Sequence, residues 1–248
     1  MDRTTAVTEL TAVSLFAGVG GFELALGNHG VKVVASVEID DAARGVLAHK
    51  FPDSKLFSDV KEVTGDDLIA AGFIPERGII TGGFPCQDLS VAGRRAGLDG
   101  ARSGLYWEIV RLAEETQSKW LVLENVPGLL TSQSGRDMGI VLGTLVDRGY
   151  SVSWRVLDAQ HFGVPQRRRR VFIVAGRTTD RRVGQILLEP EGSRRDLETS
   201  EPQGQRTTST SATGARLYGQ TGFARYTEGG TTLTATTYKR PEDNVVVR

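Results

Sequence analysis

The chain has 248 residues, enough for one sizeable core or for one large domain with a smaller appendage. Its 30 basic and 30 acidic side chains cancel, which argues against a protein that coats nucleic acid through bulk charge alone. No run approaches the ~18 apolar residues of a membrane span and the N-terminus lacks a signal-peptide core, so we expect a cytoplasmic protein with no membrane partner.

Strand and helix patterns alternate along the first 177 residues. Residues 10–16, "LTAVSLF", predict a buried strand, which the glycine turn "AGVGG" and a helix over residues 22–30 follow. This alternation implies an α/β protein with a mostly parallel sheet that helices cover on both faces. The same patterns predict strands over residues 31–39, 78–84, 119–126, 151–159 and 169–176, and helices over residues 40–51, 66–73, 104–117 and 135–150.

The character of the chain changes after Arg177. Residues 189–237 are rich in Thr, Ser, Gly and Arg and show little apolar periodicity, so we expect a loop-rich segment that is partly mobile or completed by a partner. We therefore divide the chain into a larger domain, residues 1–180, and a smaller region, residues 181–248.

Candidate ligand-binding residues follow the expected parallel strands, at the edge of the sheet where ligands bind in such proteins. The loop "FAGVGG", Phe16–Gly21, lets backbone approach a nucleoside closely, and Glu38 lies 20 residues after Gly18, where a carboxylate accepts hydrogen bonds from ribose hydroxyls. Asp59 follows a further expected strand, which lies between those over residues 31–39 and 78–84. An ordinary strand-to-helix turn with a helix-capping acid is the alternative. The dinucleotide fingerprint fails because its third glycine would fall at Glu23, so we expect a nucleoside other than NAD.

The chain holds one cysteine, Cys86, directly after a proline in the loop that follows the strand over residues 78–84. One cysteine excludes an internal disulfide, and three scattered histidines do not match the ligand spacing of a zinc site, so we expect no metal. Cys86 is therefore either an inert core residue or a reactive thiol.

Acidic and basic residues are expected beside Cys86. Glu124 closes a strand and would point into the same crevice, with Asn125 next to it in a shaped loop; a solvated strand-end acid is the alternative. The run "QRRRR" precedes the last apolar strand, so Arg168 and Arg170 share one face of an extended segment. Taken alone, such a charge run is also typical of a solvated face.

Together these residues closely resemble the cytosine-C5 DNA methyltransferases. The resemblance covers residues 12–177 in the family's order, through "FAGVGG", Glu38, Asp59, "GGFPCQDLS", "LENV" and "QRRRR". It implies a Rossmann-like methyltransferase sheet over residues 1–180, a small target-recognition region over residues 181–248, and double-stranded DNA as the partner. The implied cofactor is S-adenosyl-L-methionine, bound by Phe16, Ala17, Gly18, Val19, Gly20, Gly21, Glu38, Ile39, Asp59, Val60 and Leu105.

Within this set, the resemblance gives Phe16 a stacking contact with adenine, Glu38 the ribose, and Asp59 a place near the adenine amino group. The glycine-rich residues 90–104 resemble the mobile loop that closes over a target base flipped out of the duplex. Methyl transfer then leaves S-adenosyl-L-homocysteine as the product.

The resemblance also assigns the chemistry. Cytosine C5 is too electron-poor to attack a methyl sulfonium unaided, so a thiolate, implied to be that of Cys86, must first add to C6. Glu124 is implied to donate to N3 of the base as charge develops there. Arg168 is implied to bind the base O2 and to steady the charged carboxylate. Arg170, as the second arginine of the motif, and Asn125 complete the implied catalytic set.

The end of the chain departs from the family's pattern. The family continues into a further block and a closing helix, and "NVVVR" stops where that block would begin. We expect a monomer, with completion by a separate C-terminal polypeptide as the alternative. The composition of residues 181–248 gives no code for the DNA sequence that is read.

Two other functions remain open beside a DNA methyltransferase of a restriction-modification system or a phage genome. The first is an RNA (tRNA) cytosine-C5 methyltransferase, since some relatives act on tRNA with the same fold. The second is a catalytically weak DNA-binding partner subunit. The presence of Cys86, Glu124, Arg168 and the full set of cofactor residues argues against this second alternative, and the absent C-terminal block leaves it open.

Overall fold

The structure is a computed structural model that describes residues 9–85, 104–177, 183, 186–187 and 243–246. The described residues do not include Cys86, residues 90–103 of the glycine-rich segment, or most of residues 181–248. None of the helices described is both long and apolar enough to cross a membrane.

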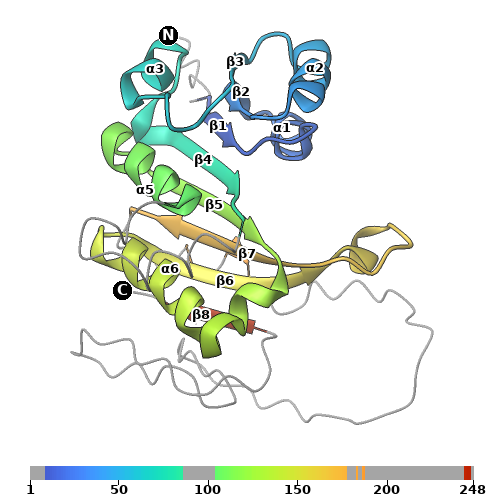
Figure 1. The fold of residues 1–248 in the computed structure, drawn as a ribbon, viewed down its shortest axis with the longest axis vertical. Coiled ribbons are helices and arrows are strands. Elements are labelled where there is room, and N and C mark those ends of the chain that lie inside the picture. The colour runs from blue at the N-terminus through green and yellow to red at the C-terminus, as the bar shows by residue number, and fades with distance from the viewer. Residues whose placement is uncertain (1–8, 86–103, 178–182, 184–185, 188–242, 247–248) are drawn as a thin grey trace, which may run out of the picture.

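The described strands form one sheet in the order β3-β2-β1-β4-β5-β7-β6-β8 (Figure 1). The strands are β1 (Thr11–Leu15), β2 (Lys32–Val37), β3 (Lys55–Phe57), β4 (Gly78–Gly83), β5 (Trp120–Asn125), β6 (Ser151–Asp158), β7 (Arg169–Gly176) and β8 (Asp243–Val246). The α-helices are α1 (Gly21–Gly27), α2 (Asp41–Lys50), α3 (Gly65–Ala70), α5 (Leu105–Thr116) and α6 (Arg136–Asp147). Short 3₁₀ turns are η1 (Pro75–Arg77), η3 (Pro127–Leu130), η4 (Ser132–Gly135) and η5 (Ala159–Phe162).

The first five strands are parallel, as the alternation of strand and helix patterns predicts. From β1 the chain moves outward through β2 to β3, and it then returns to β4 and moves in the opposite direction to β5. Because crossover connections are right-handed, this reversal places α1 and α2 on one face and α3 and α5 on the other. Figure 1 shows the two pairs of helices on opposite sides of this part of the sheet. The expected α/β sheet with helices on both faces is confirmed.

The last three strands run antiparallel to their neighbours, so the sheet is mixed. β7 pairs with β5 and with β6, and β8 pairs with the far side of β6. Residues 159–168 alone connect β6 to β7, which is shorter than the crossover of about a dozen residues or more that a parallel pair requires. The alternation of patterns did not specify this change of direction.

The core lies on both faces of the central strands. All five residues of β1 are buried, because helices cover the sheet on either side. The inner face of α5 contributes Tyr106 and Ile109, both without exposed surface. The Tyr106 hydroxyl donates to the carbonyl of Val141 at 3.0 Å, and burial raises the pKa of this phenol, so it remains a protonated donor that ties α5 to α6.

Described residues beyond Arg177 contact the same sheet. The Ser153 hydroxyl donates to the carbonyl of Val183 at 2.8 Å, and Arg155 donates to the carbonyl of Leu187 at 2.9 Å. The strand β8 also pairs with β6. The division of the chain near residue 180 remains a prediction.

Candidate active site

The order of the strands reverses between β1 and β4, because β2 and β3 lie on one side of β1 whereas β4 and β5 lie on the other. Leu15 at the end of β1 is in register with Val37 on β2 and with Gly82 on β4. Gly83, also on β4, is in register with Glu124 on β5. The strand ends that the sequence analysis identified as candidate ligand-binding positions therefore lie at one edge of the sheet. Open α/β sheets bind their ligands at this edge.

Two positions of the loop after β1, Gly18 and Gly20, favour glycine for different physical reasons. Gly18 has φ of 56°, a left-handed conformation, and a Cβ atom added there would meet nothing within 4 Å. Gly20 has φ of 96°, and its added Cβ would lie 2.2 Å from Cε2 of Phe51. Gly20 thus allows the loop to pack against Phe51, whereas the space beside Gly18 is open to a ligand. Phe16 is left-handed too, with φ of 55°.

Glu23, where a dinucleotide-binding loop would carry its third glycine, is buried in α1. Its carboxylate accepts a hydrogen bond from the Ser36 hydroxyl on β2 at 2.9 Å. The helix therefore meets the sheet through a side chain and not through the close glycine contact of that fingerprint.

Glu38 joins the glycine loop to the end of β2. One carboxylate oxygen accepts the backbone N–H of Gly18 at 2.7 Å, and the other accepts that of Asp40 at 2.9 Å. Each oxygen of a carboxylate has a second lone pair, so both remain able to accept a ligand hydroxyl. The neighbouring Ile39 and Val19 are exposed at 73% and 67%, so apolar surface flanks this carboxylate. The arrangement fits a ribose.

We expect Glu38→Ala to weaken the binding of S-adenosylmethionine by roughly 1.5–3 kcal/mol, the scale of a lost hydrogen bond to a charged group. The substitution also removes the acceptor that holds the N–H of Gly18. Isothermal calorimetry measures the change, and unchanged affinity would remove Glu38 from the site. Asp53→Ala, at an exposed residue between α2 and β3, is a control that should bind normally.

Asp59 and Val60 follow β3 at the same edge. The N–H of Glu38 donates to the carbonyl of Phe57 at 3.1 Å, so the exits from β2 and β3 are joined. The Asp59 carboxylate accepts the N–H of Lys61 at 2.9 Å. Val60 is buried, whereas the carboxylate of Asp59 is partly exposed. A contact of Asp59 with a nucleoside base remains a prediction.

Glu124 and Arg170 form an ion pair at the end of β5. Arg170 Nε lies 2.7 Å from Glu124 Oε1, and both side chains are about a quarter exposed, at 22% and 24%. The other carboxylate oxygen of Glu124 lies over Gly83, where an added Cβ would be 3.1 Å from it. Gly83 is a residue that the sequence interpretation missed, although it is part of the quoted "GGFPCQDLS" segment. Its lack of a side chain leaves room for the carboxylate.

The structure assigns Glu124 a different partner from the one that the resemblance implied. Arg168, expected to steady this carboxylate, lies before β7 with an exposed side chain, and its N–H donates to the Asp158 carboxylate at 3.0 Å. Glu124 is in register with Phe172 on β7, and Arg170 lies two residues from Phe172 on the same face. A long side chain at that diagonal position reaches across the strand pair. Asp158 was not among the predicted residues.

Asn125 ties the end of β5 to the exit from β4. Its side-chain amide donates to the carbonyl of Phe84 at 2.7 Å, and its side-chain oxygen accepts the N–H of Val126 at 2.8 Å. Asn125 is 2% exposed, and its bond to Phe84 is shielded from water. Phe84 precedes Cys86 by two residues, and Asn125 therefore anchors the backbone that leads to the cysteine.

The remaining predicted residues are placed only in part. Leu105 begins α5 and packs against the core, directly after the undescribed residues 86–103. Cys86 lies outside the described residues. Within residues 9–85, 104–177 and the short described segments that follow, no group of three or more His, Cys, Asp or Glu side chains could hold a metal ion.

Comparisons with known proteins point to one family. The model of the family "C-5 cytosine-specific DNA methylase" matches residues 10–237. The chain is 35% identical over 193 residues to the Type II methyltransferase M2.BsuMI of Bacillus subtilis, covering 76% of this chain and 47% of that protein. It is 39% identical over 164 residues to the Type II methyltransferase M.MspI of Moraxella, covering 66% of this chain and 38% of that protein.

Solved structures share the fold. A protein of an E. coli prophage, described as a DNA modification methyltransferase, superposes with a TM-score of 0.55 at 26% identity, over 68% of this chain and 47% of that chain. Spodoptera frugiperda DNMT2 has a TM-score of 0.55 at 21% identity, over 68% and 50% of the two chains, and shows the fold alone. The chain spans about half the length of the relatives it matches, or less. On the family match and the identities to these relatives, the chain belongs to the C-5 cytosine-specific DNA methylases.

Proposed function

We propose that this protein transfers a methyl group from S-adenosylmethionine to C5 of a flipped-out cytosine in a specific double-stranded DNA sequence, through a covalent adduct with Cys86. One observation carries the proposal: Glu124, paired with Arg170 over Gly83, stands beside the backbone of Phe84 that Asn125 holds. An acid, a cation and the approach to a thiol thus share the carboxyl edge of β4 and β5. The Type II methyltransferase relatives favour DNA as the substrate.

The residues of the chain divide the chemical work. The Cys86 thiolate forms a bond to C6 of cytosine, and the electron pair of the C5–C6 double bond moves toward N3, where Glu124 delivers a proton. Arg170 holds Glu124 in place and can lie close to the base O2. When bound, the cofactor would supply an electrophilic methyl group to C5. A base would then remove the C5 proton, re-formation of the C5–C6 double bond would expel the Cys86 thiolate, and N3 would return its proton to Glu124.

The residues after β1, β2 and β3 fit the cofactor. Open space beside Gly18, the two oriented oxygens of Glu38 and the partly exposed carboxylate of Asp59 suit the backbone approach, the ribose and the base of a nucleoside. Phe16, at the mouth of the same loop, would stack on adenine. Residues 181–248 would carry target recognition, and the protein would work in the cytoplasm as a monomer.

Labelled S-adenosylmethionine separates DNA methylation from tRNA methylation. We expect label to enter double-stranded DNA and not tRNA, and bisulfite sequencing of DNA from cells that express the complete gene should show one methylated sequence context. Transfer of label to tRNA alone would favour the RNA enzyme. DNA that is already fully methylated at that context is the control and should accept no label.

A further inference from the structure

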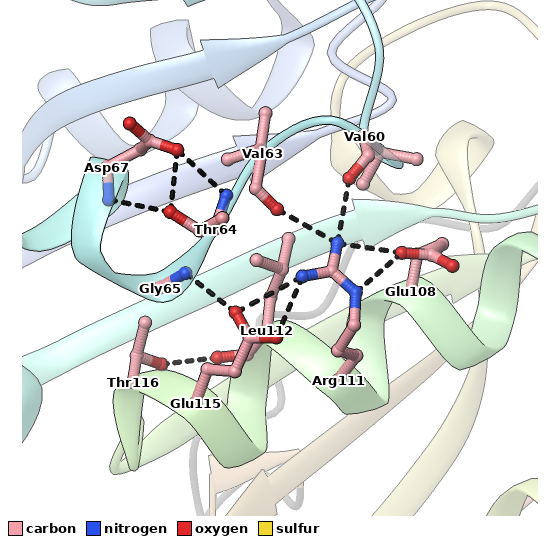
Figure 2. Close-up of polar contacts among 10 residues, drawn as sticks. All are labelled: Val60, Val63, Thr64, Gly65, Asp67, Glu108, Arg111, Leu112, Glu115 and Thr116. Atoms are coloured by element: carbon pink, nitrogen blue, oxygen red, sulfur yellow. Dashed lines mark hydrogen bonds and ion pairs between the residues drawn. The ribbon is translucent and has the colours of Figure 1, made fainter.

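Side chains of α5 hold the loop that connects β3 to α3 through hydrogen bonds to its backbone. Figure 2 shows Arg111, on α5, reaching toward this loop with its guanidinium between two carboxylates. Arg111 Nη2 donates to the carbonyl oxygens of Val60 and Val63, each at 2.9 Å. Two backbone groups of a non-helical segment thus converge on one side chain.

Two glutamates of α5 orient the arginine. Arg111 Nε donates to Glu108 at 2.8 Å, and Nη1 donates to both carboxylate oxygens of Glu115 at 2.9 and 3.1 Å. Burial opposes the charge, but the bonds to Glu115 and Glu108 outweigh it and raise the pKa of Arg111 above its ordinary value. All three guanidinium nitrogens are therefore engaged, and the side chain has one favoured orientation.

Glu115 also holds the far end of the loop. One of its oxygens accepts the N–H of Gly65, the first residue of α3, at 2.7 Å. A Cβ at Gly65 would lie 2.7 Å from Cβ of Glu115, so only glycine allows this approach. The loop from Val60 to Gly65 is consequently attached to α5 at three backbone groups (Figure 2).

The first of these attachments lies next to a proposed cofactor residue. Asp59 immediately precedes Val60, and its carboxylate is in turn fixed by the N–H of Lys61. The Val60 carbonyl and the Lys61 N–H belong to the same planar peptide unit, so a shift of this carbonyl moves the donor that fixes the Asp59 carboxylate. The buried side chains of Val60 and Val63 keep the loop on the core, but they do not set the direction of its carbonyl groups.

We propose that Arg111 is a positioning residue, which holds the Asp59–Val60 segment in the orientation that receives the adenine of the cofactor. This inference rests on the proposed function, because it takes the ligand to be S-adenosylmethionine or its product. Arg111 itself does not touch the nucleoside. Its effect passes through the carbonyl of Val60 to the carboxylate of Asp59.

The test compares Arg111→Met and Arg111→Lys with Arg148→Met in calorimetric titrations with S-adenosylhomocysteine. Arg148, the residue directly after α6, is the matched control, because it is part-buried, pairs with Glu114 of α5 at 2.7 Å and donates to the carbonyl of Thr144 of α6. We expect Arg111→Met to bind about tenfold more weakly, as loss of hydrogen bonds to a charged group implies, and Arg148→Met to bind normally. Arg111→Lys keeps the positive charge but lacks the planar guanidinium group. Its affinity for S-adenosylhomocysteine should therefore lie between those of Arg111→Met and the unsubstituted chain.

A second ligand separates positioning from a general loss of stability. S-inosylhomocysteine carries a carbonyl group where adenine has its amino group, so the unsubstituted chain should prefer S-adenosylhomocysteine. That preference should shrink in Arg111→Met and persist in Arg148→Met. Unchanged affinity and preference in both Arg111 variants, or equal losses in the Arg111 and Arg148 variants, would overturn the inference. Failure of the unsubstituted chain to bind S-adenosylhomocysteine would instead contradict the proposed function, and the inference with it.

Discussion

Replacing Cys86 by serine is expected to lower the rate of methyl transfer by orders of magnitude and to leave the affinity for S-adenosylmethionine nearly unchanged. Cytosine C6 requires a strong nucleophile, and a serine hydroxyl stays protonated near neutral pH where a thiol readily forms a thiolate. The backbone anchor from Asn125 to the carbonyl of Phe84 does not involve the substituted side chain. Single-turnover methylation and calorimetry measure the two quantities separately.

DNA with 5-fluorocytosine in the target gives an independent check on the nucleophile. Fluorine cannot leave as a cation, so the adduct should persist after methyl transfer, and peptide mapping should locate it at Cys86. The Cys86→Ser variant is the control and should form no adduct. An adduct at another residue, or near-normal turnover of the serine variant, would contradict the assignment.

The second large effect is expected at Glu124. Glu124→Ala should slow methyl transfer far more than Glu124→Gln, because glutamine retains a donor for N3 of the base and nearly the same shape. The structure gives a reason for this order. A glutamine oxygen can accept from Arg170 Nε as Glu124 Oε1 does, which leaves the amide nitrogen in the place of the oxygen that lies over Gly83.

Single-turnover rates at saturating cofactor and DNA compare the two Glu124 variants. Glu114→Ala is the matched control, because Glu114 also pairs with an arginine, Arg148, but lies on α5 in a contact with α6 and away from the strand ends. Its rate should equal that of the unsubstituted chain. Equal rates for Glu124→Gln and Glu124→Ala would mean that the carboxyl group only fills space.

Much of the fold and of the site was predictable because the signals are local. The two-residue period of strands and the 3.6-residue period of helices gave the order of elements up to Gly176. In a parallel sheet the residues after successive strands must lie at one edge, so Phe16, Glu38 and Glu124 could be assigned to a common site before any contact was known. The structure brings the ends of β1, β2, β4 and β5 together as this reasoning requires.

The order of strands and helices, the strand-end residues and the family resemblance were thus determined by the amino-acid sequence itself. Only the tertiary structure decided that Arg170 pairs with Glu124, that β6, β7 and β8 run antiparallel, and that Arg111 holds the loop at Val60. The physical reason is that these features depend on register between distant strands and on backbone carbonyls, which every residue carries. A one-residue change of register would turn Arg170 to the opposite face of β7, and the motif alone does not set that register.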